Sequence, residues 1–391
     1  MLGIRIDRKL EELNANWDAA ILKMRRFCGF WNTFGLSISG RVMAVKTYIM
    51  SQAIYFMGVI PLPEQKGIEM NEIITEYVRG GGRALEASRR TLCEELGGYG
   101  VIDVRVLNDS IKCTWIKRWS EERNFYDFPM LYAVKERGQL LDRVGKRGVE
   151  AVGLPVLSNI LCCWSRFKDK FYGIGENIKR ALLFENECLG DDYSTCVELL
   201  VFDHNRYREL QGRLRAVRIE ETLDEQGGII AMVEMNRKWN VNINWAEYFR
   251  LRTEINRIMD RYEDTVDKKE GKTLNEFVES KRKGCKRYRM VMIGRRTNWY
   301  KERDPKEIAS AATLWGGDLA NMSRTQVEMN FGAWKIMRLE ADFKNFLFKL
   351  VQGRLYMNQA LAHFANVRPA CTFCSIAEKR KMRGEGIEED G

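Results

Sequence analysis

Apolar residues recur at helical spacing through the region between Trp17 and Trp119. Side chains three and four positions apart share one face of an α-helix, so this spacing predicts helices that each bury one stripe. Only 6 prolines occur in 391 residues, so little interrupts long helices. The sequence therefore predicts a mainly α protein. The expected buried stripes are Trp17, Ile21, Met24, Cys28 and Trp31; Val42, Val45, Ile49, Ala53 and Phe56; Ile68, Ile73, Ile74 and Tyr77; and Val101, Val104, Ile111, Trp115 and Trp119.

Polar caps, prolines and glycines mark the ends of these helices. Ser37 or Ser39 is the candidate N-cap of the second helix, which we expect to end at Gly58 and the break at Pro61-Leu62-Pro63. A run of glycines at residues 80–82 ends the third helix, because glycine adopts backbone conformations that other residues avoid.

The chain is long enough for two or three folding units, since a single core stops growing at about 250–300 residues. We expect a short strand at 1–7, helices at 8–122, a helix-rich linker region at 123–330, a helical block at 331–376 and a charged tail at 377–391 that does not fold. Within the linker region, the basic, glycine-spaced residues 137–147 are expected to form a loop or linker. Residues 223–228 are expected to form a turn.

The charge of the chain favours partners that carry phosphate. The net charge is +10 and the pI is about 9.0, which suits nucleic acid, although charge alone does not separate it from an anionic membrane surface. Residues 42–60 are apolar, but Lys46 interrupts them, so we expect a buried core helix and no membrane span. The 10 cysteines are scattered and no secretory signal is present, which predicts reduced thiols inside the cell, in the nucleus or the cytoplasm.

Basic residues interleaved with aromatic residues are the main functional signal. Lysine and arginine neutralise phosphates, and aromatic rings can stack on unpaired bases. The alternative for each residue is that the aromatic stripe is core and the cations only solvate the opposite face. The window 281–303 is the most basic, and we expect it to form a second RNA-binding surface. The candidate nucleic-acid contacts are Lys23, Arg25, Arg26, Arg41, Lys46, Lys112, Lys117, Arg118, Lys281, Arg282, Lys283, Lys286, Arg287, Arg295 and Arg296.

Candidate metal ligands are few. Cys371 and Cys374 have the spacing that lets two thiolates reach one zinc ion, but a structural site needs four ligands. His204 and His363, the only histidines, stand at no obvious partner spacing. The pair Asp191-Asp192 resembles a polymerase aspartate pair, but its polar left flank favours a loop or a helix cap over a strand. No phosphate-binding loop, metalloprotease motif or activated nucleophile is apparent, so no catalytic residue is assigned.

Several short motifs occur in the order in which one protein family carries them. They are Leu2-Gly3-Ile4; Trp31 with Leu36-Ser37 and Ser39-Gly40-Arg41; Tyr55 with Pro61-Leu62-Pro63; Tyr77 to Gly81; Gly97-Gly98-Tyr99-Gly100-Val101 with Asp103, Asn108 and Trp115; Leu223-Asp224 with Gly227-Gly228 and Tyr248; Phe346 to Lys349 with Arg354-Leu355 and Asn358; and Cys371-Thr372-Phe373-Cys374. Together they resemble the part of non-LTR (LINE-type) retrotransposon reverse transcriptases that follows the palm. The likeness covers most of the chain.

The resemblance implies a residual palm strand, a helical thumb, a linker and a truncated zinc knuckle. In the family these parts clamp the template–primer duplex and bind RNA and DNA during target-primed reverse transcription. The family's catalytic aspartates and their magnesium belong to the palm, before residue 1, so polymerase activity is not expected of this chain alone. Glu378 fits the zinc-knuckle pattern, but Met382 and the remaining tail supply neither the His nor the Cys of the family.

Three interpretations follow from these patterns. The first is a nucleic-acid-binding fragment that grips RNA, DNA or an RNA–DNA hybrid. The second is a catalytically silent helical interaction protein or a retroelement relic without activity. The third is a polymerase supplied in two pieces, whose partner would be a palm-and-fingers fragment of the same element.

Overall fold

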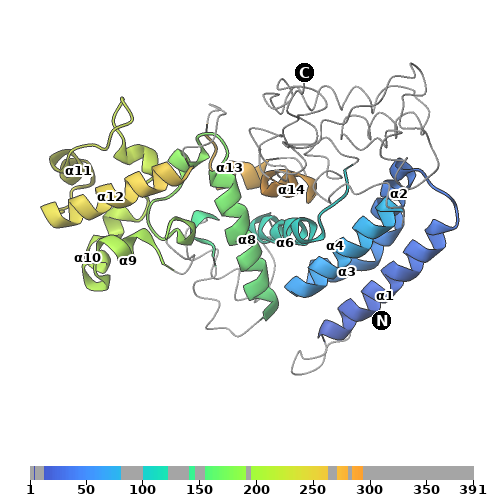
Figure 1. Ribbon diagram of the computed structural model, residues 1–391. Helices are drawn as coiled ribbons and strands as arrows, with labels where there is room; N and C mark the ends of the chain where they lie inside the picture. The colour runs from blue at the N-terminus through green and yellow to red at the C-terminus, as the bar shows by residue number, and fades with distance from the viewer. Residues whose placement is uncertain are drawn as a thin grey trace, which may run out of the picture. The chain divides into compact units, whose positions relative to one another are not determined.

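The computed structural model describes residue 4 and residues 13–80, 100–121, 141–145, 155–190, 195–262, 271–280 and 284–293 (Figure 1). Helices dominate these residues and no strand occurs among them; isolated bridges join Leu182 to Arg218 and Leu223 to Ile229. The predicted mainly α fold is confirmed. The strand predicted at residues 1–7 lies outside the described residues except for Ile4, which is not in a strand.

The described helices fall into longer helices and short helical segments. The longer ones are α1 (Leu13–Asn32), α3 (Ser51–Val59), α4 (Glu64–Arg79), α6 (Val104–Glu121), α8 (Pro155–Tyr172), α10 (His204–Leu214), α11 (Met232–Trp239), α12 (Trp245–Tyr262) and α14 (Lys286–Ile293). The shorter ones are α2 (Ile38–Ala44), η1 (Val45–Ile49), η3 (Leu141–Arg143), η5 (Asn177–Arg180), η6 (Glu187–Leu189), α9 (Val197–Val201), η7 (Ile219–Thr222) and α13 (Leu274–Glu279).

The chain divides into two compact units. The first unit comprises Met1–Ile21, Gln52–Met70 and Asp103–Arg295, and the second comprises Leu22–Ser51, Asn71–Ile102 and Arg296–Gly391. These units do not follow the boundary predicted at residue 122. Helix α6, which precedes that boundary, packs in the first unit against α8 and α14, which follow it.

The predicted stripes of α1 and α4 are buried, except for Trp31 on α1, which is half-buried, and Ile68 on α4. Trp17, Ile21, Met24 and Cys28 are buried on α1, as expected from their spacing. On α4 the side chains of Ile73, Ile74 and Tyr77 are buried, whereas Ile68 is 43% exposed. The prediction for Ile68 was wrong because nine positions at about 100° each place it roughly opposite Tyr77 on the helix.

The single helix predicted from residue 37 to residue 58 is divided into three segments. Ser37 caps α2, since its side chain accepts a hydrogen bond from Gly40 N. The π-helical turn η1 follows, with Met50 N donating to Val45 O at 2.9 Å, before α3 begins. Val45, Thr47 and Ile49 are β-branched, which disfavours regular α-helix there. Helix α3 ends at Val59, just before the predicted proline break.

Aromatic side chains form the centre of the core in the first unit. Trp164 and Phe167 of α8 stack with ring centroids 5.0 Å apart, and Phe167 lies 5.2 Å from Tyr288 of α14. Phe277 of α13 contacts the same cluster at 5.3 Å from Phe167. The buried apolar residues of α8 recur at spacings of three and four, and α8 lies in the region expected at 123–330 to be helix-rich.

The part of the predicted loop or linker at residues 137–147 that the structure describes is the short turn η3 with irregular backbone after it, but it is buried. Residues 141–145 are all buried, and Leu141 and Val144 belong to the core of the first unit. Asp142 Oδ1 accepts a hydrogen bond from Tyr172 Oη at 2.8 Å. A Cβ at Gly145 would meet Glu187 Oε2 at 2.3 Å, so the glycine permits a close approach to this buried carboxylate. The polar residues of this segment therefore serve packing.

The turn predicted at residues 223–228 is confirmed. Asp224 N donates to Gly228 O at 2.7 Å, and Asp224 Oδ1 accepts from the backbone N–H groups of Gln226 and Gly228. Gly227 has a φ of 83°, which suits glycine. The aspartate side chain thus satisfies backbone donors that the turn leaves without other partners.

No single helix among the described residues is long and apolar enough to cross a membrane. The consecutive segments Ile38–Ile49 and Ser51–Val59 pass that test of length and composition only when taken together. Of the predicted stripe Val42, Val45, Ile49, Ala53 and Phe56, the first four residues are buried inside the protein, in keeping with the predicted core helix, and Phe56 is half-buried.

Candidate nucleic-acid interface

The exposed face of α1 in the second unit carries cations followed by an aromatic residue. Lys23, Arg25 and Arg26 are exposed, while Met24 between them is buried. Lys23, Arg26 and Phe30 stand at positions i, i+3 and i+7, so they share one strip of the helix. We call Lys23, Arg25 and Arg26 the α1 cations.

Aromatic rings continue this surface beyond the end of α1. Phe30, Phe34 and Tyr48 are 57%, 55% and 46% exposed. Trp31 and Tyr48 stack with ring centroids 4.8 Å apart and an interplanar angle of 30°, and Phe30 lies 5.2 Å from Phe34. The sequence interpretation did not include these exposed rings. Phe30 and Phe34, four residues apart and off the buried stripe, were the available signal.

Arg41, a predicted phosphate contact, has its guanidinium bound to protein acceptors. Its Nε donates to Leu36 O at 3.0 Å, and its Nη1 donates to Asn32 Oδ1 and Tyr77 O, each at 2.7 Å. The guanidinium carbon lies 5.4 Å from the Tyr77 ring centroid. Arg41 therefore joins the segment after α1 to the C-terminal turn of α4. The phosphate contact predicted for Arg41 is corrected to a structural role, because protein acceptors occupy its Nε and Nη1 donors.

Lys112 is also removed from the candidate contacts. Its side chain is fully buried in the first unit, and Nζ donates to Met57 O at 2.9 Å and Ile60 O at 2.8 Å. These carbonyls lie at the end of α3, where a helix leaves acceptors without partners. Burial lowers the pKa of the Lys112 ammonium to about 8, although Cys163 and Asp109 act in the opposite direction. A buried ammonium bound to two carbonyls cannot reach a phosphate.

The remaining predicted cations of α6 differ from each other. Lys117 is 8% exposed, and its Nζ donates to Ser280 O at 2.9 Å, so its predicted phosphate contact is also corrected. Arg118 is exposed, with its guanidinium carbon 4.8 Å from the Trp115 ring centroid. A guanidinium held over an aromatic face keeps donors for a phosphate. Of these two residues, Arg118 alone retains the predicted role.

The other candidates lie on η1 and α14 or outside the described residues. Lys46 is half-buried on η1 and Lys286 is exposed on α14. Arg287 donates to Ser280 O at 3.2 Å and to Ser280 Oγ at 2.6 Å, with its guanidinium 4.0 Å from the Phe277 ring centroid. Arg287 thus packs within the first unit. The candidates outside the described residues are Lys281, Arg282, Lys283, Arg295 and Arg296.

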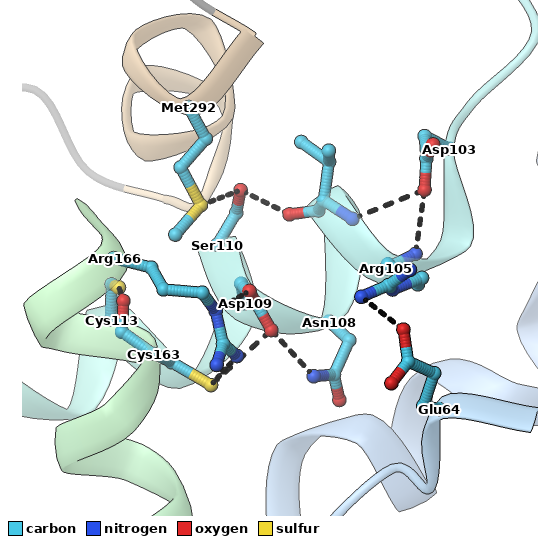
Figure 2. Close-up of polar contacts among 11 residues, drawn as sticks. Glu64, Asp103, Arg105, Asn108, Asp109, Ser110, Cys113, Cys163, Arg166 and Met292 are labelled. Atoms are coloured by element: carbon cyan, nitrogen blue, oxygen red, sulfur yellow. Dashed lines mark hydrogen bonds and ion pairs between the residues drawn. The ribbon is translucent and has the colours of Figure 1, made fainter. Parts of the chain in front are cut away.

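Asp109 connects α6 to α8 and explains the polar composition of α6 (Figure 2). Its Oδ2 accepts from Arg166 Nε at 2.8 Å, and its Oδ1 accepts from Cys163 Sγ at 3.3 Å. Asn108 Nδ2 donates to the same carboxylate at 3.0 Å, and Ser110 Oγ donates to the thioether Sδ of Met292 on α14 at 3.5 Å. These polar residues therefore hold helices of the first unit together.

The motif residues near α6 also have structural roles. Asp103 Oδ1 accepts from the backbone N–H groups of Arg105 and Val106, which caps the start of α6. Trp115 Nε1 donates to Gly58 O at 2.8 Å, beside the carbonyls that Lys112 binds. Asp103 and Trp115 are thus explained by helix capping and by the attachment of α6 to the end of α3.

No metal-binding group of three or more His, Cys, Asp or Glu side chains converges within the described residues. Cys371 and Cys374 lie outside those residues, as do Asp191 and Asp192. The flank before the aspartates forms the 3-10 turn η6 and no strand, in keeping with the predicted loop or cap, although Glu187 in it is 1% exposed. Burial raises the pKa of the Cys28 thiol to about 11 and that of Cys188 to about 12, which makes both poor nucleophiles at neutral pH.

No protein-family model matches this chain, and neither a curated protein nor a solved structure is significantly similar to it.

Proposed function

We propose that this chain binds nucleic acid through its phosphate backbone, as the thumb and linker portion of a non-LTR retrotransposon reverse transcriptase. The observation that carries the proposal is the α1 surface, where Lys23 and Arg26 share a strip with the exposed ring of Phe30. Cations that neutralise phosphates release condensed counterions, and this release favours binding to any sequence. The ordered motifs supply the family and the template–primer hybrid as the ligand.

The proposed contacts are those predicted cations that the structure leaves exposed. They are Lys23, Arg25, Arg26, Arg118 and Lys286. An RNA–DNA hybrid has the groove shape and the phosphate spacing that such cations recognise without reading base edges. The proposed role of these cations is therefore to position the RNA–DNA hybrid. The polymerase chemistry belongs to the family's palm.

The test compares two variants of the full chain that lose the same charge. Replacement of all three α1 cations by glutamine should weaken binding of a labelled RNA–DNA hybrid by about tenfold or more at moderate salt. The matched control replaces Arg208, Arg213 and Arg237, which are exposed on α10 and α11, by glutamine. Fluorescence anisotropy gives both affinities.

The control variant should retain most of the wild-type affinity, because its cations lie outside the proposed contacts. Equal losses in the two variants would show that only net charge matters. Absence of hybrid binding by the wild type would contradict the proposal and favour the catalytically silent interaction protein.

A further inference from the structure

Helix α12 of the first unit exposes two large aromatic rings on one turn. Trp245 is 61% exposed and Phe249 is 55% exposed. Their rings stack with centroids 5.8 Å apart and an interplanar angle of 30°. We call this pair the α12 aromatic platform. Exposed apolar area of this kind is unfavourable in water, so its presence on an otherwise amphipathic helix suggests a ligand.

The platform is held rigidly by the start of α12. Asn244 Oδ1 accepts from Glu247 N at 2.9 Å, while Asn244 N donates to Glu247 Oε2 at 3.0 Å, a reciprocal cap. Arg206 of α10 pairs with the same carboxylate at 3.1 Å. Tyr248, between the two exposed rings in sequence, is buried and donates to Ile230 O at 3.2 Å. The rings therefore need little reorganisation to bind a ligand.

The charges around the platform favour an anionic ligand. Glu247 and Glu254 are neutralised by ion pairs with Arg206 and Arg257. Arg250 and Arg252 are exposed, and neither has an ion-pair or hydrogen-bond partner in the part of the chain that the structure describes. Arg252 stands three residues after Phe249, so its guanidinium extends the same face of the helix.

We infer that the α12 aromatic platform binds single-stranded nucleic acid. Unpaired bases stack on Trp245 and Phe249, and Arg252 contacts the adjoining phosphate. A duplex does not fit this site, because its base faces are already stacked. A protein partner fits less well, because two rings offer on the order of 300 Å² of apolar area, against about 800 Å² per partner in a stable interface. This site goes beyond the hybrid contacts proposed for the α1 cations.

The test measures binding of a short, unstructured, labelled oligouridine to the full chain by fluorescence anisotropy. Trp245→Ala should weaken binding by about tenfold, because stacking contributes about 1–3 kcal/mol per base. Trp245→Phe should stay within about threefold of wild type, whereas Trp245→Leu should resemble the alanine variant, because leucine keeps apolar area without an aromatic face. Val233→Ala, at a 62% exposed apolar residue of α11, is the control and should leave affinity unchanged.

Oligouridine affinity that is unchanged in Trp245→Ala, or fully kept in Trp245→Leu, would overturn the inference and leave a protein contact as the explanation of the platform. Binding of the RNA–DNA hybrid is measured in parallel and should not respond to Trp245→Ala. Loss of oligouridine binding in Trp245→Ala supports this site even if replacing the α1 cations leaves hybrid binding intact. The two proposals can therefore fail separately.

Discussion

Single cations of this chain have opposite roles that their residue type does not reveal. Lys23 is exposed on α1, whereas Lys112 is fully buried and donates to Met57 O and Ile60 O. A buried acceptor that loses its donor retains the full cost of its desolvation. Replacement of Lys112 should therefore change the free energy of unfolding. Replacement of Lys23 should instead change the affinity for nucleic acid.

Lys112→Met should lower the free energy of unfolding by about 2–4 kcal/mol, because both carbonyls lose their donor while the apolar stem is kept. Chemical denaturation measures the change. Lys23→Met, at an exposed position, should change stability by less than about 0.5 kcal/mol. Equal stability of the two variants would contradict the role assigned to Lys112.

The pH dependence of the free energy of unfolding of the wild type and of Lys112→Met gives a second test of the role of Lys112. Its pKa is about 8 in the folded chain and 10.5 as the ordinary value. Between these values the unfolded chain binds more protons, so stability rises with pH. The stability advantage of wild type over Lys112→Met should therefore grow from pH 8 to about pH 10.5, measured by denaturation at each pH. An advantage that shrinks over this window would contradict the burial of a charged ammonium.

One arginine connects three helical elements of the second unit. Arg41 of α2 donates to Asn32 at the end of α1 and to Tyr77 O in the last turn of α4. A cation near the C-terminus of a helix also interacts favourably with the helix dipole. The planar guanidinium serves several acceptors at once, which an ammonium cannot do with the same geometry.

Arg41→Lys keeps the charge but should lower the free energy of unfolding by about 1–3 kcal/mol, because the forked hydrogen bonds are lost. Hybrid affinity should stay close to wild type in the folded variant. Denaturation and anisotropy are measured on the same preparation. A variant of wild-type stability with weakened hybrid binding would restore the phosphate contact that the sequence predicted.

In the molecule as a whole, buried thiols make the free energy of unfolding depend on pH in the alkaline range. Burial raises the pKa of Cys28 to about 11 and of Cys188 to about 12, from an ordinary value of 9.0, and it also raises the pKa values of Cys113 and Cys163. The folded chain then holds protons that the unfolded chain releases, so stability falls as pH rises above about 9.

The free energy of unfolding should therefore decrease steadily between pH 9 and pH 11, after the smaller opposing effect of Lys112 is subtracted. Denaturation under reducing conditions across this range measures the decrease. Cys188→Ala should make the decrease shallower, because one raised thiol is removed. A flat profile in the wild type would indicate that these thiols reach solvent in the folded chain.

The presence of the helices was predictable from the sequence. The burial of individual polar side chains was not. Spacing alone located α1 and α4, and Ser37 marked the start of α2, because these signals are local. The burial of Lys112, Arg143 and Lys117 depends on partners 55, 72 and 163 residues away in sequence, which no local pattern contains. Polar helices such as α6 therefore looked like binding surfaces.

The candidate site was predictable only in part for the same reason. Lys23 and Arg26 lie opposite a regular buried stripe, so their exposure followed from helical geometry. Residues 141–145 looked like a basic loop, since glycine and arginine usually indicate solvent exposure, yet the carboxylate of Glu185 pairs with Arg143 at 2.9 Å in a buried site. Long-range ion pairs of this kind decide which cations stay available to a ligand.

The salt dependence of hybrid binding tests the central proposal most directly. The logarithm of the association constant is measured against the logarithm of salt concentration for the wild type and for the variant that lacks the α1 cations. Because each phosphate contact contributes about one to the slope, the variant's slope should be smaller by about three. Parallel lines for the two proteins would contradict the assignment of Lys23, Arg25 and Arg26 as phosphate contacts.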